Sequence, residues 1–235
     1  MELIREPIDG DTLDCRRTMY PCTLTVHRGG ARKIGSPTST SYGFVVSGEA
    51  RLRSQGFDLR AGAGTFFCIP DELELEADDR VVVMERYGFR GLLTAGRIEP
   101  TGRLSYIDGC SDTILVSPPR WGDSVLNHLH FPRGIDQSQH THPSVRLGVV
   151  ARGEGIAYSR GTAGKAGWEQ KLAPGCVFLL HAHEMHSFRT VESAVEMDVI
   201  AFHPDSDWGP TDGVHPMLNR TFIGQKPPRS GHGAE

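Results

Sequence analysis

Two groups of histidines in this 235-residue sequence have spacings that suit metal binding. In the segment QHTHPS, His140 and His142 are two residues apart, so on a β-strand both imidazoles project from the same face. The segment APGCVFLLHAHEMHSF carries His181, His183 and His186 where an apolar run ends in a turn. An antiparallel barrel brings such segments side by side. Three neutral imidazoles that converge on one point would bind a single divalent cation, with Zn, Fe(II), Ni, Co and Mn all suitable.

Nearby residues offer candidate substrate-binding and proton-transfer groups. In NHLHF, His128 and His130 form another same-face pair, which would either line a barrel mouth or serve the structure. Tyr158 is a further candidate for the cavity wall. Glu184 and Glu196 are candidate general bases, although a solvated loop charge is the alternative for Glu184.

The stretch AFHPDSDWGPTDGVHPMLNRTFIG follows the last strand-like segment and is rich in Asp, Gly and Pro. Such a loop could cap the barrel mouth and add His215, Asp212 or Arg220 to the site. The alternative is a structural strap along the barrel edge.

The elements that must position these residues are short strands. Apolar and alternating segments recur between Gly, Pro and Asp clusters, and the chain contains 28 glycines and 15 prolines. This rhythm predicts an all-β sandwich or barrel. YGFVVSGEARLR parallels LGVVARGEGIAYS, and AGAGTFFCIPDE parallels APGCVFLLHAHE, with offsets of 105 residues between Gly48 and Gly153 and 111 between Gly64 and Gly175. We therefore expect an internal duplication with two similar barrels.

The domain boundaries follow from this duplication. We predict a first barrel over residues 1–105 and a second over 106–223, joined by a Gly-, Asp- and Pro-rich segment at 95–112. Residues 224–235 lack large apolar side chains, which predicts a disordered tail.

The second copy resembles the cupin superfamily. The first cupin motif has a His-x-His pair, a Glu four residues later and a Gly seven further on, and the second has Pro-Gly, an apolar strand and a His near its end. The matching residues are His140, His142, Gly153, Pro174, Gly175 and His186. The resemblance implies two tandem double-stranded β-helix barrels and a first shell of His140, His142 and His186.

Arg146 occupies the position of the usual glutamate ligand. A guanidinium does not coordinate a cation, but it can hold a substrate carboxylate bidentately. The alternative is a surface ion pair on the other face of the strand. His181 and His183 replace the usual Pro and Gly, so either could be a fourth ligand or an acid/base group, or both could face solvent.

The first copy lacks these donors. Alignment of Gly48 with Gly153 places Gly35, Pro37 and Ser41 at the ligand positions, and Leu75 stands where the third histidine should be. We expect this barrel to bind no metal and to pack against its partner, or to support a homodimer by strand exchange as in other cupins.

The whole-chain composition excludes several classes. A net charge of −4 and a pI near 6.3 provide no basic surplus for nucleic acid. No apolar run approaches the roughly 18 residues needed to span a membrane, and the N-terminus is unlike a signal peptide, so we expect a cytoplasmic protein. Five cysteines with no CxxC pair predict reduced thiols, buried for Cys68 and Cys176.

In finer detail the sequence is similar to the cupin component of bacterial hydrazine synthetases. That similarity implies a small, amino-acid-derived carboxylate substrate and an N–N bond-forming rearrangement in specialised metabolism, with Arg146 or Arg220 holding the carboxylate. Two alternatives are an Fe(II) dioxygenase, because thiol and diketone dioxygenases use three-histidine cupin sites, and a non-catalytic binding cupin. The absence of a helix-turn-helix pattern and the density of histidines disfavour a sensor or storage role.

Overall fold

A computed structural model describes residues 1–118, 120, 122–161, 164, 166–192 and 195–206. Strands dominate this part of the chain, and one short 3-10 helix, η1, spans Ile107–Gly109. The strands are β1 (Glu2–Ile4), β2 (Thr12–Asp14), β3 (Cys22–Ile34), β4 (Ser39–Val45), β5 (Glu49–Ser54), β6 (Phe57–Gly62), β7 (Thr65–Pro70), β8 (Leu73–Tyr87), β9 (Thr94–Arg97), β10 (Leu104–Ser105), β11 (Ser111–Val116), β12 (Val125–Phe131), β13 (Arg146–Arg152), β14 (Gly155–Ser159), β15 (Trp168–Leu172), β16 (Val177–Leu180), β17 (Ser187–Arg189) and β18 (Met197–His203).

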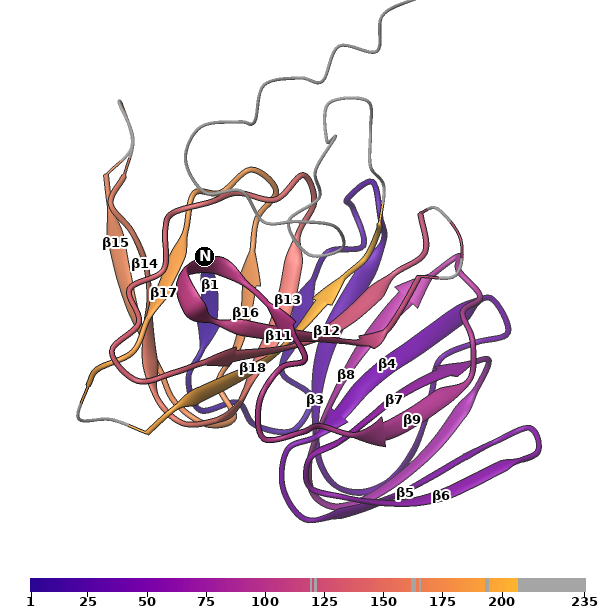
Figure 1. The fold of residues 1–235 in the computed structure, drawn as a ribbon. Coiled ribbons are helices and arrows are strands. Elements are labelled where there is room, and N and C mark those ends of the chain that lie inside the picture. Colours follow the sequence, from indigo (N-terminus) through magenta and orange to yellow (C-terminus); the bar gives the residue numbers. More distant parts are fainter. Residues whose placement is uncertain (119, 121, 162–163, 165, 193–194, 207–235) are drawn as a thin grey trace, which may run out of the picture.

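The strands build two antiparallel barrels that stand side by side (Figure 1). The first consists of an eight-stranded sheet, in which β2-β3-β8-β4-β7-β9 follow one another and β5 and β6 branch from β8. The second combines a seven-stranded sheet, ordered β1-β16-β13-β18-β12-β11-β10, with a three-stranded sheet, ordered β15-β14-β17. The all-β, two-barrel prediction is therefore confirmed. Strand β1 pairs with β16, so the N-terminal residues join the sheet of the second barrel.

The pairing pattern repeats between the barrels. In the first, β8 lies between β3 and β4, and β4 also pairs with β7; in the second, β18 lies between β12 and β13, and β13 also pairs with β16. Gly43 is paired with Phe67 in the first copy, and Gly148 with Phe178 in the second. These two pairs reproduce the offsets of 105 and 111 residues found in the sequence. The internal repeat is thus visible in strand register.

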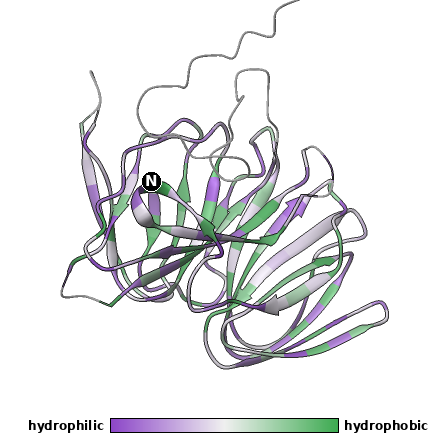
Figure 2. Ribbon diagram, viewed as in Figure 1, coloured by the Kyte–Doolittle hydropathy of each residue, from purple (hydrophilic) through white to green (hydrophobic). Residues whose placement is uncertain are grey.

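Three apolar clusters hold the barrels together. One fills the first barrel around Leu52, Phe67 and Leu75, and another fills the second around Phe131 and Phe178. The third contains residues of both copies and lies where the barrels meet. Figure 2 shows hydrophobic residues along these adjoining strands. As a consequence, β4, β12 and β18 are buried along their whole length, on both faces.

The glycine of each repeated pair makes room for an aromatic ring. A Cβ atom on Gly43 would lie 2.1 Å from Cζ of Phe67, well inside van der Waals contact. We predict that Gly43→Ala lowers the free energy of unfolding by about 1–3 kcal/mol, because the ring must leave its packed position. Urea denaturation measures this change. Gly62→Ala is the control, because its Cβ would meet no atom within 4 Å, and an equal loss in both variants would contradict the prediction.

The five cysteines are all buried free thiols, as predicted for Cys68 and Cys176. Among the described residues, the structure has no helix with the length and apolar character needed to cross a membrane.

Candidate metal centre

Three histidines meet inside the second barrel. His140 and His142 lie in the segment before β13, and His186 directly precedes β17. The backbones of His140 and His186 are joined by two hydrogen bonds, in which each N–H donates to the other carbonyl at 2.9 and 3.0 Å. This bridge brings together segments 46 residues apart in the sequence. One nitrogen atom from each of the three rings lies within 4.8 Å of the others.

Hydrogen bonds from the ring Nδ1 atoms orient two of the three imidazoles. Nδ1–H of His140 donates to the carbonyl of Ser138 at 3.0 Å, and Nδ1–H of His186 donates to the carbonyl of Glu184 at 2.8 Å. These bonds favour the tautomer in which Nε2 carries a lone pair, the arrangement usual for metal-bound histidine. Among the described residues, Nε2 of His186 and Nδ1 of His142 are buried without a hydrogen-bond partner. Unpaired buried nitrogens suit a cation ligand set.

The electrostatics keep the three rings neutral. Burial lowers the pKa of His140, and it holds the pKa values of His142 and His186 well below the ordinary value of 6.5. The positive charge of Arg146 acts in the same direction on all three. A metal bound at about 2.1 Å from each nitrogen places its ligands about 3.4 Å apart, so only small ring movements are needed. The residues present therefore fit a single divalent metal.

Arg146 projects into the cavity beside these histidines. Its side chain is buried, and Nη1 donates to the Ser144 hydroxyl at 2.7 Å and to the carbonyl groups of Ser144 and Val145 at 3.2 and 2.9 Å. Nε and Nη2 are buried with no hydrogen-bond partner among the described residues. The alternative of a surface ion pair is wrong for this residue. Two unpaired guanidinium donors on one side chain have the geometry to donate two parallel hydrogen bonds to a carboxylate.

The guanidinium remains cationic at neutral pH. Burial lowers the pKa of Arg146 to about 10, while the charge of Asp205 opposes that shift. Tyr106 lines the cavity, and burial raises the pKa of its hydroxyl, which stays protonated. Apolar side chains form much of the remaining wall: Leu129, Phe131, Phe178, Leu180, Phe188 and Ala201. The space between them measures about 20 Å³, enough for an ion or about one water molecule.

His203 is a wall residue that the sequence analysis did not select. It ends β18, is buried, and its ring centroid lies 6.2 Å from that of His142. The alternation along β18 could have indicated it, because Val199 and Ala201 point into the second barrel and His203 continues that face. His203 adds a fourth imidazole to the cavity.

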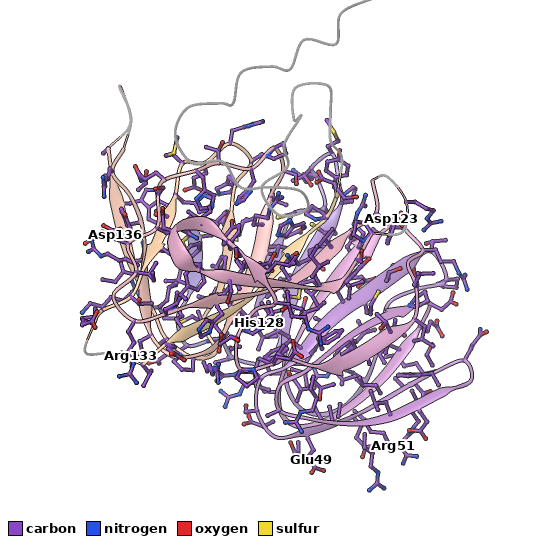
Figure 3. All side chains as sticks on the ribbon, in the orientation of Figure 1. Glu49, Arg51, Asp123, His128, Arg133 and Asp136 are labelled. Carbon is purple, nitrogen blue, oxygen red and sulfur yellow. The ribbon has the colours of Figure 1, made fainter. Side chains whose placement is uncertain are left out.

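His128 and His130 share one face of β12, as their spacing predicts, but that face points away from the cavity. Nε2 of His128 and Nδ1 of His130 lie 2.9 and 2.8 Å from Oδ1 of Asp198, whose Oδ2 accepts a hydrogen bond from Arg152. Figure 3 labels His128 near the middle of the molecule, between the barrels. The cavity is lined instead by Leu129 and Phe131 of the same strand. His128 and His130 therefore do not line the cavity, contrary to their prediction as substrate-binding residues.

The loop histidines lie at the surface. Nε2 of His181 is 3.2 Å from a carboxylate oxygen of Glu2. The side chain of His183 is exposed, and its backbone N–H donates to the backbone carbonyl of His142 at 2.7 Å. Glu184 accepts hydrogen bonds from the N-terminal ammonium group of Met1 and from the backbone of His181. None of the three candidate catalytic side chains lines the cavity.

The remaining candidates have other surroundings. The Tyr158 hydroxyl donates to a carboxylate oxygen of Asp136, and the ring is covered by the guanidinium of Arg189. Glu196 is half-exposed, 4.0 Å from Nε2 of His130. The candidates His215, Asp212 and Arg220, and the predicted tail, lie outside the described residues.

A buried carboxyl lies behind the cavity wall. Both carboxyl oxygens of Asp112 lie 2.9 Å from Nδ2 of Asn127, and burial raises its pKa to about 7. Between about pH 4 and 7 the native protein binds a proton that the unfolded chain does not, so this contribution to stability is present at low pH and is lost as pH rises.

We predict that Asp112→Asn removes this loss, which is on the order of 4 kcal/mol in the wild type. Urea unfolding at pH 5 and pH 8, an interval that contains about 3 kcal/mol of this loss, compares the two proteins, with the half-exposed Asp79→Asn variant as control. Parallel pH profiles for wild type and Asp112→Asn would contradict the prediction.

Comparison with known proteins identifies the fold. Residues 129–229, which include the three histidines and Arg146, match the family model described as the AraC-like ligand binding domain. The "Cupin 2 conserved barrel domain protein" from Leptotrichia buccalis aligns over 86% of this chain and 95% of its own, at 16% identity and a TM-score of 0.59. The chain has the cupin fold.

Two metabolic enzymes share this cupin architecture. A salicylate 1,2-dioxygenase variant from Pseudoaminobacter salicylatoxidans, in complex with gentisate, aligns over 83% of this chain and 74% of its own, at 13% identity and a TM-score of 0.60. Oxalate decarboxylase from Bacillus subtilis, described with Mn(II) centres, aligns over 88% and 76%, at 10% identity and a TM-score of 0.57. No curated protein matches the sequence.

Proposed function

We propose that this cupin is a metal-dependent enzyme that acts on a small carboxylate-bearing substrate in the second barrel. The observation that carries the proposal is the placement of Arg146. Among the described residues, its unpaired Nε and Nη2 donors lie in the same cavity as three neutral histidines, and Nδ1 of His142 and Nε2 of His186 have no hydrogen-bond partner there. A buried guanidinium with two free donors is suited to an anionic ligand in addition to the charge of Asp205, and the neighbouring histidines are suited to a metal.

The residues divide the chemistry between them. A divalent cation held by His140, His142 and His186 would supply Lewis-acid stabilisation of charge that develops on the substrate. Arg146 holds the carboxylate and fixes the orientation of the substrate relative to the three histidines. The apolar wall excludes water, which strengthens these electrostatic interactions. Because the space is only about 20 Å³, binding of a whole substrate must move lining side chains.

The substrate that we favour is amino-acid-derived, and the reaction that we favour is an N–N bond-forming rearrangement. Support for the reaction comes from the sequence resemblance, and support for a carboxylate on the substrate comes from Arg146. The N–N bond forms as the N–O bond of an N-hydroxylated amino acid breaks, and the oxygen leaves as water, so no external oxidant such as dioxygen is needed.

An Fe(II)-dependent dioxygenase is the second candidate. It is favoured by the three-histidine set and by the apolar wall, which suits an apolar co-substrate such as dioxygen. The third candidate function is that of a non-catalytic cupin that binds a carboxylate.

Metal and oxygen measurements distinguish these functions. The full chain is purified without added metal, and its metal content is determined by mass spectrometry. Samples loaded with Zn or Fe(II) are then incubated with oxalate, with salicylate, with glycine, or with an N-hydroxylated amino acid together with a second amino acid. We expect one metal per chain and a product that contains an N–N bond, without oxygen uptake. Oxygen uptake coupled to product would establish the dioxygenase instead. Binding without turnover would leave a binding protein, and failure to bind any metal would refute the proposal.

A further inference from the structure

The first barrel has a pocket at the place where the second has its metal centre. The repeated strand register aligns Ser41 with Arg146, since each lies two residues before its paired glycine. Ser41 is opposite Glu85 on β8. In the cavity next to this position, Gly35 stands where the second barrel has His140. Its volume of about 240 Å³ is far larger than the space beside the histidines, so loss of the ligand side chains has left room.

This pocket contains a buried imidazole without a partner. His27 lies on β3, and its side chain lines the pocket although only 7% of the residue is exposed. Both ring nitrogens are buried and make no hydrogen bond to any described residue. A buried polar group in this condition costs on the order of 1–3 kcal/mol, which a bound ligand would recover. Because burial lowers the pKa of His27 to about 4, the ring offers one donor and one acceptor at neutral pH.

The charges around the pocket favour a cation. Lys33 at its edge is paired with Glu74, 3.6 Å away. In the part of the chain that the structure describes, Glu85 makes no ion pair with a lysine or arginine, and its carboxylate interacts with the Tyr87 hydroxyl. One carboxylate is thus left uncompensated, so an anionic ligand would be repelled.

A bound metal does not explain the pocket. The described residues contain one group of three or more potential metal ligands, and it lies in the second barrel. The threonine hydroxyls that line the wall already have partners, since Oγ1 of Thr23 is 3.2 Å from the Tyr87 hydroxyl and Oγ1 of Thr25 is 3.0 Å from that of Thr12. The volume is below that of a drug-sized site, which indicates a small ligand.

We propose that the first barrel binds a small hydroxyl-bearing primary amine, with its ammonium group on Glu85 and its hydroxyl on His27. This site is separate from the metal centre and does not depend on the function proposed for it. The first barrel, which lacks the three candidate metal-ligand histidines, then keeps a ligand-binding role of its own.

Calorimetric titration of the full, metal-loaded chain with 2-aminoethanol tests the proposal, with ethylene glycol and glycolate as neutral and anionic controls. Of the three compounds, we expect only 2-aminoethanol to bind. Its affinity should fall by about 10-fold or more in Glu85→Gln, because a charge-assisted hydrogen bond is lost. In the ¹⁵N spectrum of the histidine rings, assigned with His27→Phe, the amine should shift the His27 signals.

Two results would overturn the proposal. One is the absence of binding to the wild type, and the other is binding of equal strength to Glu85→Gln. Glu85→Gln keeps the shape of the side chain, so the test does not depend on the stability of the His27 variant.

Discussion

Replacement of His186 by alanine is expected to weaken metal binding by roughly 100-fold or more, because one of three protein ligands is removed. Loss of a residue that only hydrogen-bonds to a ligand already costs about 10- to 100-fold. The activity of the centre should be lost with the metal. His186 is chosen because its Nε2 is buried without a partner and its orientation is fixed by the Glu184 carbonyl. Metal content after dialysis against a limiting concentration of Zn measures the effect.

The control for this experiment is His181→Ala. His181 lies five residues away on the same loop, but its side chain is about half-exposed and faces Glu2. We expect its metal content and activity to match the wild type. His186→Gln, which preserves side-chain volume, shows whether loss of metal comes from the missing ligand or from a cavity. Full metal occupancy in both His186 variants would exclude this residue as a ligand.

Metal binding should also raise the free energy of unfolding. A ligand that binds only the native state at 1,000 times its dissociation constant adds about 4 kcal/mol to the free energy of unfolding. A chelator should therefore lower the Tm of the wild type and leave that of His186→Ala unchanged.

Arg146→Lys is expected to weaken carboxylate binding by about 10- to 100-fold while metal content stays normal. Lysine retains the positive charge that Asp205 stabilises, but it lacks the planar fork that donates two parallel hydrogen bonds to a carboxylate. A thermal shift of the metal-loaded protein with oxalate, salicylate and glycine measures affinity. If catalysis uses the orientation that the fork imposes, kcat should fall as well as affinity.

Arg146→Met separates charge from geometry. Methionine fills much of the same volume but leaves Asp205 without its cationic neighbour, so affinity should fall further than in Arg146→Lys. Conversely, an undiminished response of both variants to every carboxylate would show that Arg146 does not hold the substrate.

Much of the fold followed from local periodicity. The recurrence of short strands between Gly, Pro and Asp clusters predicted the all-β class, and paralleled motifs predicted two copies. The pairs Gly43–Phe67 in one copy and Gly148–Phe178 in the other show why. Each pair is a contact across two neighbouring strands, so both copies keep the glycine and the aromatic ring although their separation grows from 24 to 30 residues. The domain boundaries are less local, because β1 pairs with β16 across most of the chain.

The candidate site was accessible to sequence reasoning only in part. Alternation along a strand correctly placed His128 and His130 on one face, but it did not say which face. Burial does not distinguish the two faces, because both faces of β12 and of β18 are buried. One face of each strand lines the interior of the second barrel, and the opposite face contributes to the apolar cluster between the barrels. For the same reason His203, which continues the interior face of β18, was not distinguished from its neighbours.

The sequence by itself determined which side chains share a face, and it determined that Arg146 replaces a carboxylate ligand, since both depend on spacing along one strand. The cupin resemblance had already selected His186, and the tertiary structure gives the physical reason: a backbone bridge between distant segments places His186, not His181 or His183, against His140. The tertiary structure also decided that Arg146 is buried with two free donors. Those facts depend on how closed barrels bring separate strands together, which no local pattern encodes.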